Sequence, residues 1–171
     1  MFFRNEYWFL SNMYPCKIRV NGLEFKCAEA CFQSFKTTDT ELRAKFQHLN
    51  GFEAKKLGKK IKLRPDWNDI RLEVMRRVVY AKFHQNPELQ KLLADVQGWC
   101  IVEDNTWHDT FWGKCDGVGE NWLGCILTAI RTYVRNNTLR CCYCQYRRDD
   151  QADYCIKYNN FAAEVTDCNK K

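Results

Sequence analysis

Three polar side chains in residues 28–36 have the types and the spacing of catalytic groups. Glu29, Gln33 and Lys36 stand at positions i, i+4 and i+7, so a helix would place them on one face. A carboxyl and an amine held near apolar surface acquire shifted pKa values, and such shifts are typical of catalytic acids, bases and nucleophiles. The alternative is a surface helix with an ordinary solvated face. An apolar set repeats the same spacing beside the polar one: Ala28, Phe32 and Phe35.

A second group lies in residues 105–124 and has the character of a binding loop. Asp109 and Trp112 precede glycines that let backbone N–H groups approach a ligand, and a helix is expected to follow. This pattern favours a loop that binds an anion or a sugar. The alternatives are an aspartate that caps a turn and tryptophans, Trp107 included, that belong to the core. His108 is a candidate base or an ordinary surface residue.

Turn and helix signals indicate the elements that must hold these groups. The dipeptide Asn21-Gly22 joins two alternating runs and predicts a hairpin over residues 17–26, because both central residues of a type I′ turn need positive φ. The helix that carries Glu29 is its nearest packing partner. Helical periodicity and start signals predict further helices at 40–49, 52–60, 65–83, 87–96 and 121–134, and a short strand at 99–103.

A dense cluster of positive charge lies in residues 55–64, where six of ten side chains are Lys or Arg. Such a cluster attracts phosphate and could steer an anionic ligand or a nucleic acid. The alternative is a solvated helix face. No zinc-finger, RNP or helix-turn-helix pattern accompanies it.

The composition predicts a folded protein of one domain with a tail. The 171 residues are 46% apolar, which is too rich for disorder, and no run of 18 uncharged apolar residues suggests a membrane span or a membrane partner. The start of the chain lacks the pattern of a secretory signal. Eleven cysteines, an odd number without paired regularity, favour a reducing compartment, so we expect a cytoplasmic or nuclear protein.

The helical period ends near residue 135, and residues 136–171 are expected to form a cysteine-rich extension. A zinc site there is conceivable, but the cysteine spacing lacks paired CxxC motifs and no histidine follows. We therefore expect a loosely packed extension and no metal. Its cysteines are Cys141, Cys142, Cys144, Cys155 and Cys168.

The chain resembles the NADAR domain family over residues 2–135. The resemblance departs from the usual pattern at Ala30, where histidine is common, at Phe32, where tyrosine is common, and at Thr128, where methionine is usual. The first change removes a hydrogen-bonding group beside Glu29. The residues that carry the resemblance include Phe9-Leu10-Ser11-Asn12-Met13-Tyr14-Pro15, Glu29, Phe32-Gln33, Lys36, Leu57-Gly58, Arg64-Pro65-Asp66-Trp67, Lys82-Phe83, Asn105, Asp109, Trp112-Gly113, Gly119, Asn121 and Leu123-Gly124.

The resemblance implies an N-glycosidase with a compact, mainly helical α+β domain over residues 1–135 and a small hairpin or sheet. Two substrate classes are implied: ribosylamino-pyrimidine phosphates of riboflavin biosynthesis, and ADP-ribose attached to guanine in nucleic acid. The expected partners are therefore a phosphorylated ribosyl or ADP-ribosyl molecule and ADP-ribosylated DNA or RNA. No cofactor is implied. The alternatives are a module that binds ADP-ribose or a nucleotide without cleaving it, and a nucleic-acid-binding protein that uses the lysine cluster.

Cleavage of a ribose C1′–N bond builds positive charge on the sugar, so it needs a carboxylate, a proton for the departing nitrogen and a water or nucleophile. Glu29 and Asp109 are the candidate carboxylates. Lys36 either holds phosphate and tunes Glu29, or attacks C1′ of a ring-opened sugar to form a Schiff base. The candidate binding residues are Trp67 and Trp112 for the base, Arg4, Asn12, Gln33 and Asn121 for ribose and phosphate, and the loop glycines Gly113 and Gly119.

Overall fold

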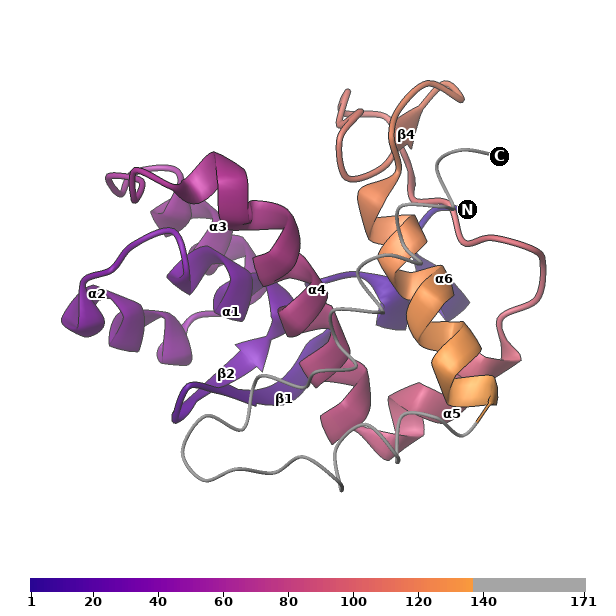
Figure 1. Ribbon diagram of the computed structural model, residues 1–171, viewed down its shortest axis with the longest axis horizontal. Coiled ribbons are helices and arrows are strands. Elements are labelled where there is room, and N and C mark those ends of the chain that lie inside the picture. The colour runs from indigo at the N-terminus through magenta and orange to yellow at the C-terminus, as the bar shows by residue number, and fades with distance from the viewer. Residues whose placement is uncertain (137–171) are drawn as a thin grey trace. The chain divides into compact units, whose positions relative to one another are not determined.

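The computed structural model describes residues 1–136 in two compact units (Figure 1). The hairpin unit is Trp8–Pro87, and the loop unit is Met1–Tyr7 together with residues 88–136. The predictions for the cysteine-rich extension fall outside the described residues. Within the described part of the chain, no helix combines the length and the apolar character that a membrane span requires.

The predicted hairpin is confirmed. Strands β1 (Pro15–Val20) and β2 (Leu23–Cys27) pair antiparallel, with Ile18 opposite Phe25. The two turn residues between them, Asn21 and Gly22, have φ values of 51° and 75°, as a type I′ turn requires. Ile18 and Phe25 are buried, so the apolar face of the hairpin is part of the core of this unit.

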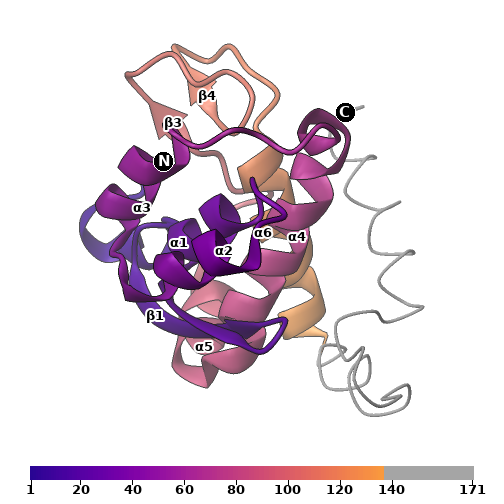
Figure 2. The ribbon, with the colours of Figure 1, turned by 90° about the vertical axis from the view of Figure 1, so that its left-hand side faces the viewer.

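Helix α1 (Ala28–Ser34) lies at the centre of the hairpin unit, and all seven of its residues are buried. It packs against the β1–β2 hairpin, against α3 (Gly51–Gly58) and against α4 (Trp67–Gln85) (Figure 2). The alternative of a surface helix with a solvated polar face is therefore wrong for this segment. The helix also ends earlier than predicted, because Phe35 is its C-cap and Lys36 lies beyond it.

The other predicted helices of this unit are present with shifted ends. The segment 40–49 is a short helix, α2 (Thr40–Lys45), followed by a 3-10 turn, η2 (Phe46–His48). The basic segment is α3, which begins at a capping box in which the side chain of Asn50 accepts from the N–H of Glu53 and the side chain of Glu53 accepts from the N–H of Asn50. The long helix α4 extends two residues further than predicted.

The loop unit contains α5 (Pro87–Asp95), which begins where the hairpin unit ends, and α6 (Trp122–Arg135). Between them two short parallel strands pair, β3 (Asp104–Asn105) and β4 (Lys114–Cys115). A 3-10 helix, η1 (Asn5–Leu10), carries the chain from this unit into the hairpin unit. Helices with two small sheets confirm the mainly helical α+β prediction.

The strand predicted at residues 99–103 is wrong, because side chains take the hydrogen-bonding groups that a neighbouring strand would need. The N–H of Ile101 donates to the hydroxyl of Thr128 at 2.8 Å, and its carbonyl accepts from the amide of Asn121 at 3.0 Å. The N–H of Glu103 donates to the same asparagine at 2.9 Å. The strand therefore begins only at Asp104.

Candidate functional site

The carboxylate of Glu29 is buried in the interior of the hairpin unit, with its side chain held by a neighbour on the same helix. Glu29 is 8% exposed, and Gln33 Nε2 donates to its Oε1 at 2.7 Å. The backbone N–H of Glu29 donates to the carbonyl of Asn12 at 2.8 Å. The structure thus brings together three of the predicted site residues in one buried group.

Two amide oxygens of residues that are hydrogen-bonded to Glu29 accept no hydrogen bond from the described residues: Asn12 Oδ1 and Gln33 Oε1. Asn12 uses its Nδ2 in a 3.2 Å contact to the sulfur of Met75. Gln33 Oε1 lies against Gly58, where an added Cβ would stand only 1.9 Å away. A buried acceptor without a donor is costly, so Asn12 Oδ1 is a candidate acceptor for a ligand hydroxyl or amine.

Lys36 lies two residues past the end of α1, directly after the C-cap Phe35, and is partly buried. Burial lowers its pKa, the carboxylate of Glu29 opposes this by favouring the ammonium, and Lys55 and Lys59 add to the lowering. The amine is therefore close enough to Glu29 for electrostatic interaction, and it is also close enough to be affected by the charges of Lys55 and Lys59. The hairpin unit as a whole carries sixteen Lys and Arg against eight Asp and Glu, a net charge of +8.

Trp67 does not present an open face to a nucleobase. Its side chain is 6% exposed and packs against Phe32, with ring centroids 5.2 Å apart. The Nζ of Lys36 lies 5.8 Å from the centroid of the indole. A ring this deeply buried has little surface left for stacking on a base, so the structure favours contact of the ring with the side chain of Lys36 over contact with a base.

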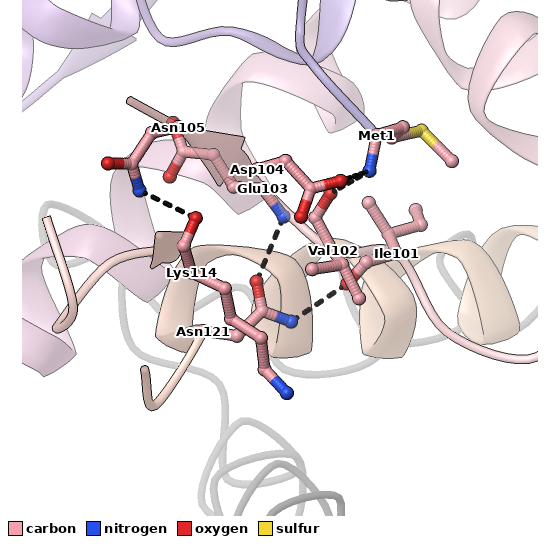
Figure 3. A network of polar contacts seen from close by, with 8 residues as sticks. All are labelled: Met1, Ile101, Val102, Glu103, Asp104, Asn105, Lys114 and Asn121. Carbon is pink, nitrogen blue, oxygen red and sulfur yellow. Dashed lines mark hydrogen bonds and ion pairs between the residues drawn. The ribbon is translucent and has the colours of Figure 1, made fainter. Parts of the chain in front are cut away.

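In the loop unit, one buried asparagine organises the predicted binding loop. Asn105 Oδ1 accepts from the N–H groups of Trp107 and Asp109 at 3.3 and 3.0 Å. Its Nδ2 donates to the carbonyl of Asp109 at 2.8 Å. The same nitrogen donates to the carbonyl of Lys114 at 3.0 Å, as Figure 3 shows. Periodicity gave no signal for this role, because the bonds of Asn105 run to loop residues up to nine positions away, which follow no helical or strand spacing.

Asp109 caps the turn that follows it, which is the alternative that its sequence context left open. Its Oδ1 accepts from the N–H groups of Phe111 and Trp112 at 3.2 and 2.8 Å. Trp112 packs edge-to-face on Phe111, with centroids 4.8 Å apart. Trp107 is 53% exposed, so the interpretation of this residue as core is wrong. The catalytic role of Asp109 stays a prediction.

Asn121 and the loop glycines fix the backbone of the same loop. Asn121 has a φ of 57°, and its side-chain amide bonds the backbone of residues 101 and 103, as Figure 3 shows. A Cβ at Gly113 would lie 2.3 Å from the carbonyl oxygen of Glu103, and one at Gly119 would lie 2.3 Å from that of Gly113. These positions therefore require close backbone approach. Their contact with substrate stays a prediction.

The start of the chain joins this network. The ammonium of Met1 donates to the carbonyl of Val102 at 2.8 Å and pairs with the carboxylate of Asp104, whose N–H donates back to the carbonyl of Met1 (Figure 3). Arg4 is exposed, and its guanidinium lies 5.5 Å from the ring centroid of Phe2. Arg4 is thus available to a ligand. Within residues 1–136, no three His, Cys, Asp or Glu side chains gather as a metal site would need.

Comparison with known proteins gives a family match and several relatives. The family model described as NADAR domain matches residues 1–135, a span that runs through both units. A riboflavin biosynthesis protein of Vibrio vulnificus is 39% identical over 134 residues, which are 75% of this chain but only 36% of that protein. The N-glycosidase YbiA of Escherichia coli is 31% identical over 131 residues, covering 74% of this chain and 81% of YbiA. The solution structure of E. coli YbiA matches with a TM-score of 0.69 at 28% identity, over 85% of each chain.

Proposed function

The chain belongs to the NADAR domain family, and we propose that it is an N-glycosidase that hydrolyses a bond between ribose C1′ and an amine nitrogen. The class, a hydrolase of N-glycosyl bonds, agrees with the name of the YbiA relatives. The proposed substrates are ribosylamino-pyrimidine phosphates and, as a second candidate, ADP-ribose on guanine of nucleic acid. The name of the Vibrio relative supports the first class.

The observation that carries the proposal is a buried carboxylate within electrostatic reach of a partly buried amine whose pKa is lowered. Glu29 is held by Gln33, and the amine of Lys36 lies within its field. Negative charge at a developing oxocarbenium ion and a proton for the departing nitrogen are the two requirements of C1′–N cleavage. Both groups come from eight consecutive residues of the hairpin unit, 29–36.

Glu29 is proposed as the group that stabilises positive charge at C1′ and relays the proton to the leaving amine. Burial strengthens its electrostatic effect, because low-dielectric surroundings screen the carboxylate less than water does. The bond from Gln33 fixes one carboxylate oxygen, and the carbonyl of Asn12 anchors the backbone of Glu29. A carboxylate held in this way needs little reorganisation during the reaction.

Lys36 has two proposed roles that differ in bond-making. In the covalent route its neutral amine adds to C1′ of the ring-opened sugar, a C1′–Nζ imine forms, and the base leaves as an amine that has taken up a proton. Water then hydrolyses the imine, which releases the sugar aldehyde and restores the lysine. In the electrostatic route Lys36 stays protonated and, with Lys55 and Lys59, binds phosphate. Its lowered pKa supports the first route, and the neighbouring cations support the second.

The test is incubation of the protein with a ribosylamino-pyrimidine phosphate and, separately, with DNA that carries ADP-ribosylated guanine, followed by mass analysis of the released base and sugar. We expect release from at least one substrate and a loss of more than about 10²-fold in rate for Glu29→Gln, which keeps shape and removes the charge. Stoichiometric binding without release from either substrate would instead support the binding module that Ala30 leaves open.

Borohydride separates the two roles of Lys36. The covalent route leaves a reduced adduct on the peptide that contains Lys36 during turnover, and Lys36→Arg is inactive in this route. The electrostatic route leaves no adduct and tolerates arginine. Binding that falls steeply with salt and is unchanged in Glu29→Gln would favour a nucleic-acid-binding protein over an enzyme.

A further inference from the structure

The turn Arg64–Trp67 contacts Lys36 at two points, through its backbone and through a ring. The N–H of Arg64 donates to the carbonyl of Lys36 at 2.8 Å, and the N–H of Trp67 donates to the carbonyl of Arg64 at 3.2 Å. The guanidinium of Arg64 forms a two-pronged pair with Asp66, at 2.6 and 2.9 Å. Because this guanidinium is already paired within the turn, it stiffens the turn and is not a spare phosphate ligand.

The ring of Trp67 contacts Phe32 of α1 and also the Nζ of Lys36. It packs against Phe32, which lies on α1 between Glu29 and Gln33, and its face lies within cation–π distance of Lys36 Nζ. The indole is therefore held by the same helix that carries the carboxylate. A lysine side chain has about 2 kcal/mol of rotamer freedom to lose, so an isolated amine at this position would not keep one direction.

We propose that the turn Arg64–Trp67 is a positioning element for Lys36: its backbone fixes the lysine carbonyl, and the indole of Trp67 supports the ammonium beside Glu29. The inference rests on the proposed function in one respect, namely that Lys36 takes part in catalysis. The contacts themselves join residues of the hairpin unit only.

The ring of Trp67 also affects the pKa of Lys36. Glu29 on α1 favours the ammonium, whereas burial and the cations Lys55 and Lys59, on α3 and at its end, favour the neutral amine. The face of an indole attracts a cation, so the ring of Trp67, like Glu29, favours the ammonium form of Lys36. Removal of the ring lowers the pKa of Lys36 further if this attraction outweighs the burial that the ring itself provides.

The first experiment measures the pKa of Lys36 directly, without any substrate. The protein is labelled with acetic anhydride between pH 6 and 11, and the extent of acetylation of the Lys36 peptide is followed by mass spectrometry. We expect the midpoint for Trp67→Leu to fall by about half to one pH unit, a three- to tenfold change in the protonation constant. Trp67→Phe, with a weaker ring, should fall between the two, and it serves as the milder variant if Trp67→Leu does not fold.

Phe32→Leu is the matched control, because it removes a buried ring that touches Trp67 but is not the ring beneath Lys36. Its Lys36 midpoint should stay near that of the unmodified protein. An unchanged or raised midpoint in Trp67→Leu would overturn the proposal, since Trp67 would then act by burial alone. An equal shift in Phe32→Leu would overturn it too, because general loosening of the core would explain the effect.

The second experiment uses turnover of whichever substrate the protein cleaves. Trp67→Leu should lower kcat at least tenfold with KM changed less than threefold, because a misplaced amine still allows binding, and the pH–rate profile should move with the labelling midpoint. A raised KM at constant kcat would refute positioning. The two proposals fail separately: an inactive protein with the expected labelling series refutes only the glycosidase, and an active protein without it refutes only the positioning element.

Discussion

The stability of the hairpin unit should rise with pH above neutrality because of one buried lysine. Lys82 on α4 is 0% exposed, and its Nζ donates to the carbonyl of Ser11 at 2.8 Å. Burial lowers the pKa of Lys82 to about 8, against the opposing effect of the nearby thiols of Cys16 and Cys27. The residue after Ser11 is Asn12, so this bond also supports the segment that anchors Glu29.

The sign and the size of the effect follow from the two pKa values. The folded pKa lies below the unfolded value of 10.5, so between these values the unfolded chain binds more protons than the folded one. The free energy of unfolding therefore increases as pH rises through this window, and the full penalty for the buried charge is present below it. A gap of about 2.5 units corresponds to about 3 kcal/mol.

The assay compares urea unfolding of the unmodified protein and Lys82→Met at several pH values from 7.5 to 10.5. The difference in unfolding free energy between the two should change by about 3 kcal/mol over this range in favour of the unmodified protein. Cysteines and tyrosines that do not interact with Lys82 are common to both proteins and cancel, and Cys16 and Cys27, which do interact with it, are replaced by serine in both proteins. Lys17→Met is the control, because Lys17 is 85% exposed and its loss should leave the slope unchanged. Parallel curves for the unmodified protein and Lys82→Met would refute the reasoning.

Three further predictions concern the site and the tail. Alanine at a helical glycine ordinarily stabilises by up to about 1 kcal/mol. Gly58→Ala should instead destabilise the protein by about 1–3 kcal/mol and lower its activity, because the added Cβ must displace the side chain of Gln33. A thermal melting temperature that is restored by adding Gln33→Ala would locate the clash at this pair. Asp109→Asn keeps a turn-capping oxygen and Asp109→Ala does not, so full activity of the first with loss in the second, in the base-release assay, would assign Asp109 to the cap alone. A chain that ends at Asn136 should stay soluble and active, because the family match ends at residue 135; precipitation or a lost cooperative melt would contradict this.

The sequence was sufficient for elements defined by local rules. The hairpin follows from Asn21-Gly22, because few residue pairs tolerate positive φ at both positions, and the helices follow from their apolar period. The strand predicted at 99–103 failed for a non-local reason. Thr128 and Asn121, about twenty to thirty residues away along the chain, take the backbone groups of residues 101 and 103.

The candidate site was predictable in composition but not in arrangement. The helical period placed Glu29 and Gln33 together, and their hydrogen bond confirms it. The same period placed Lys36 on the helix, yet the helix ends at Ser34 with Phe35 as its C-cap. The carbonyl of Lys36 instead bonds the N–H of Arg64, a partner that no local pattern identifies. Trp67 is likewise an aromatic residue whose accessible face could be judged only once its neighbours were known.

Two of the buried polar atoms that lack a hydrogen-bond partner among the described residues belong to Asn12 and Gln33, both of which are hydrogen-bonded to Glu29. A core selected for stability alone would put apolar side chains at these positions, because an unpaired buried acceptor or a buried charge costs free energy. Here the amide oxygens of Asn12 and Gln33 lack donors among the described residues, and the buried charge of Lys82 supports the same segment. Local rules of packing are broken most often where function requires it. The unpaired oxygens of Asn12 and Gln33 therefore support the proposal of a site at Glu29, and this support comes from geometry rather than from the family match.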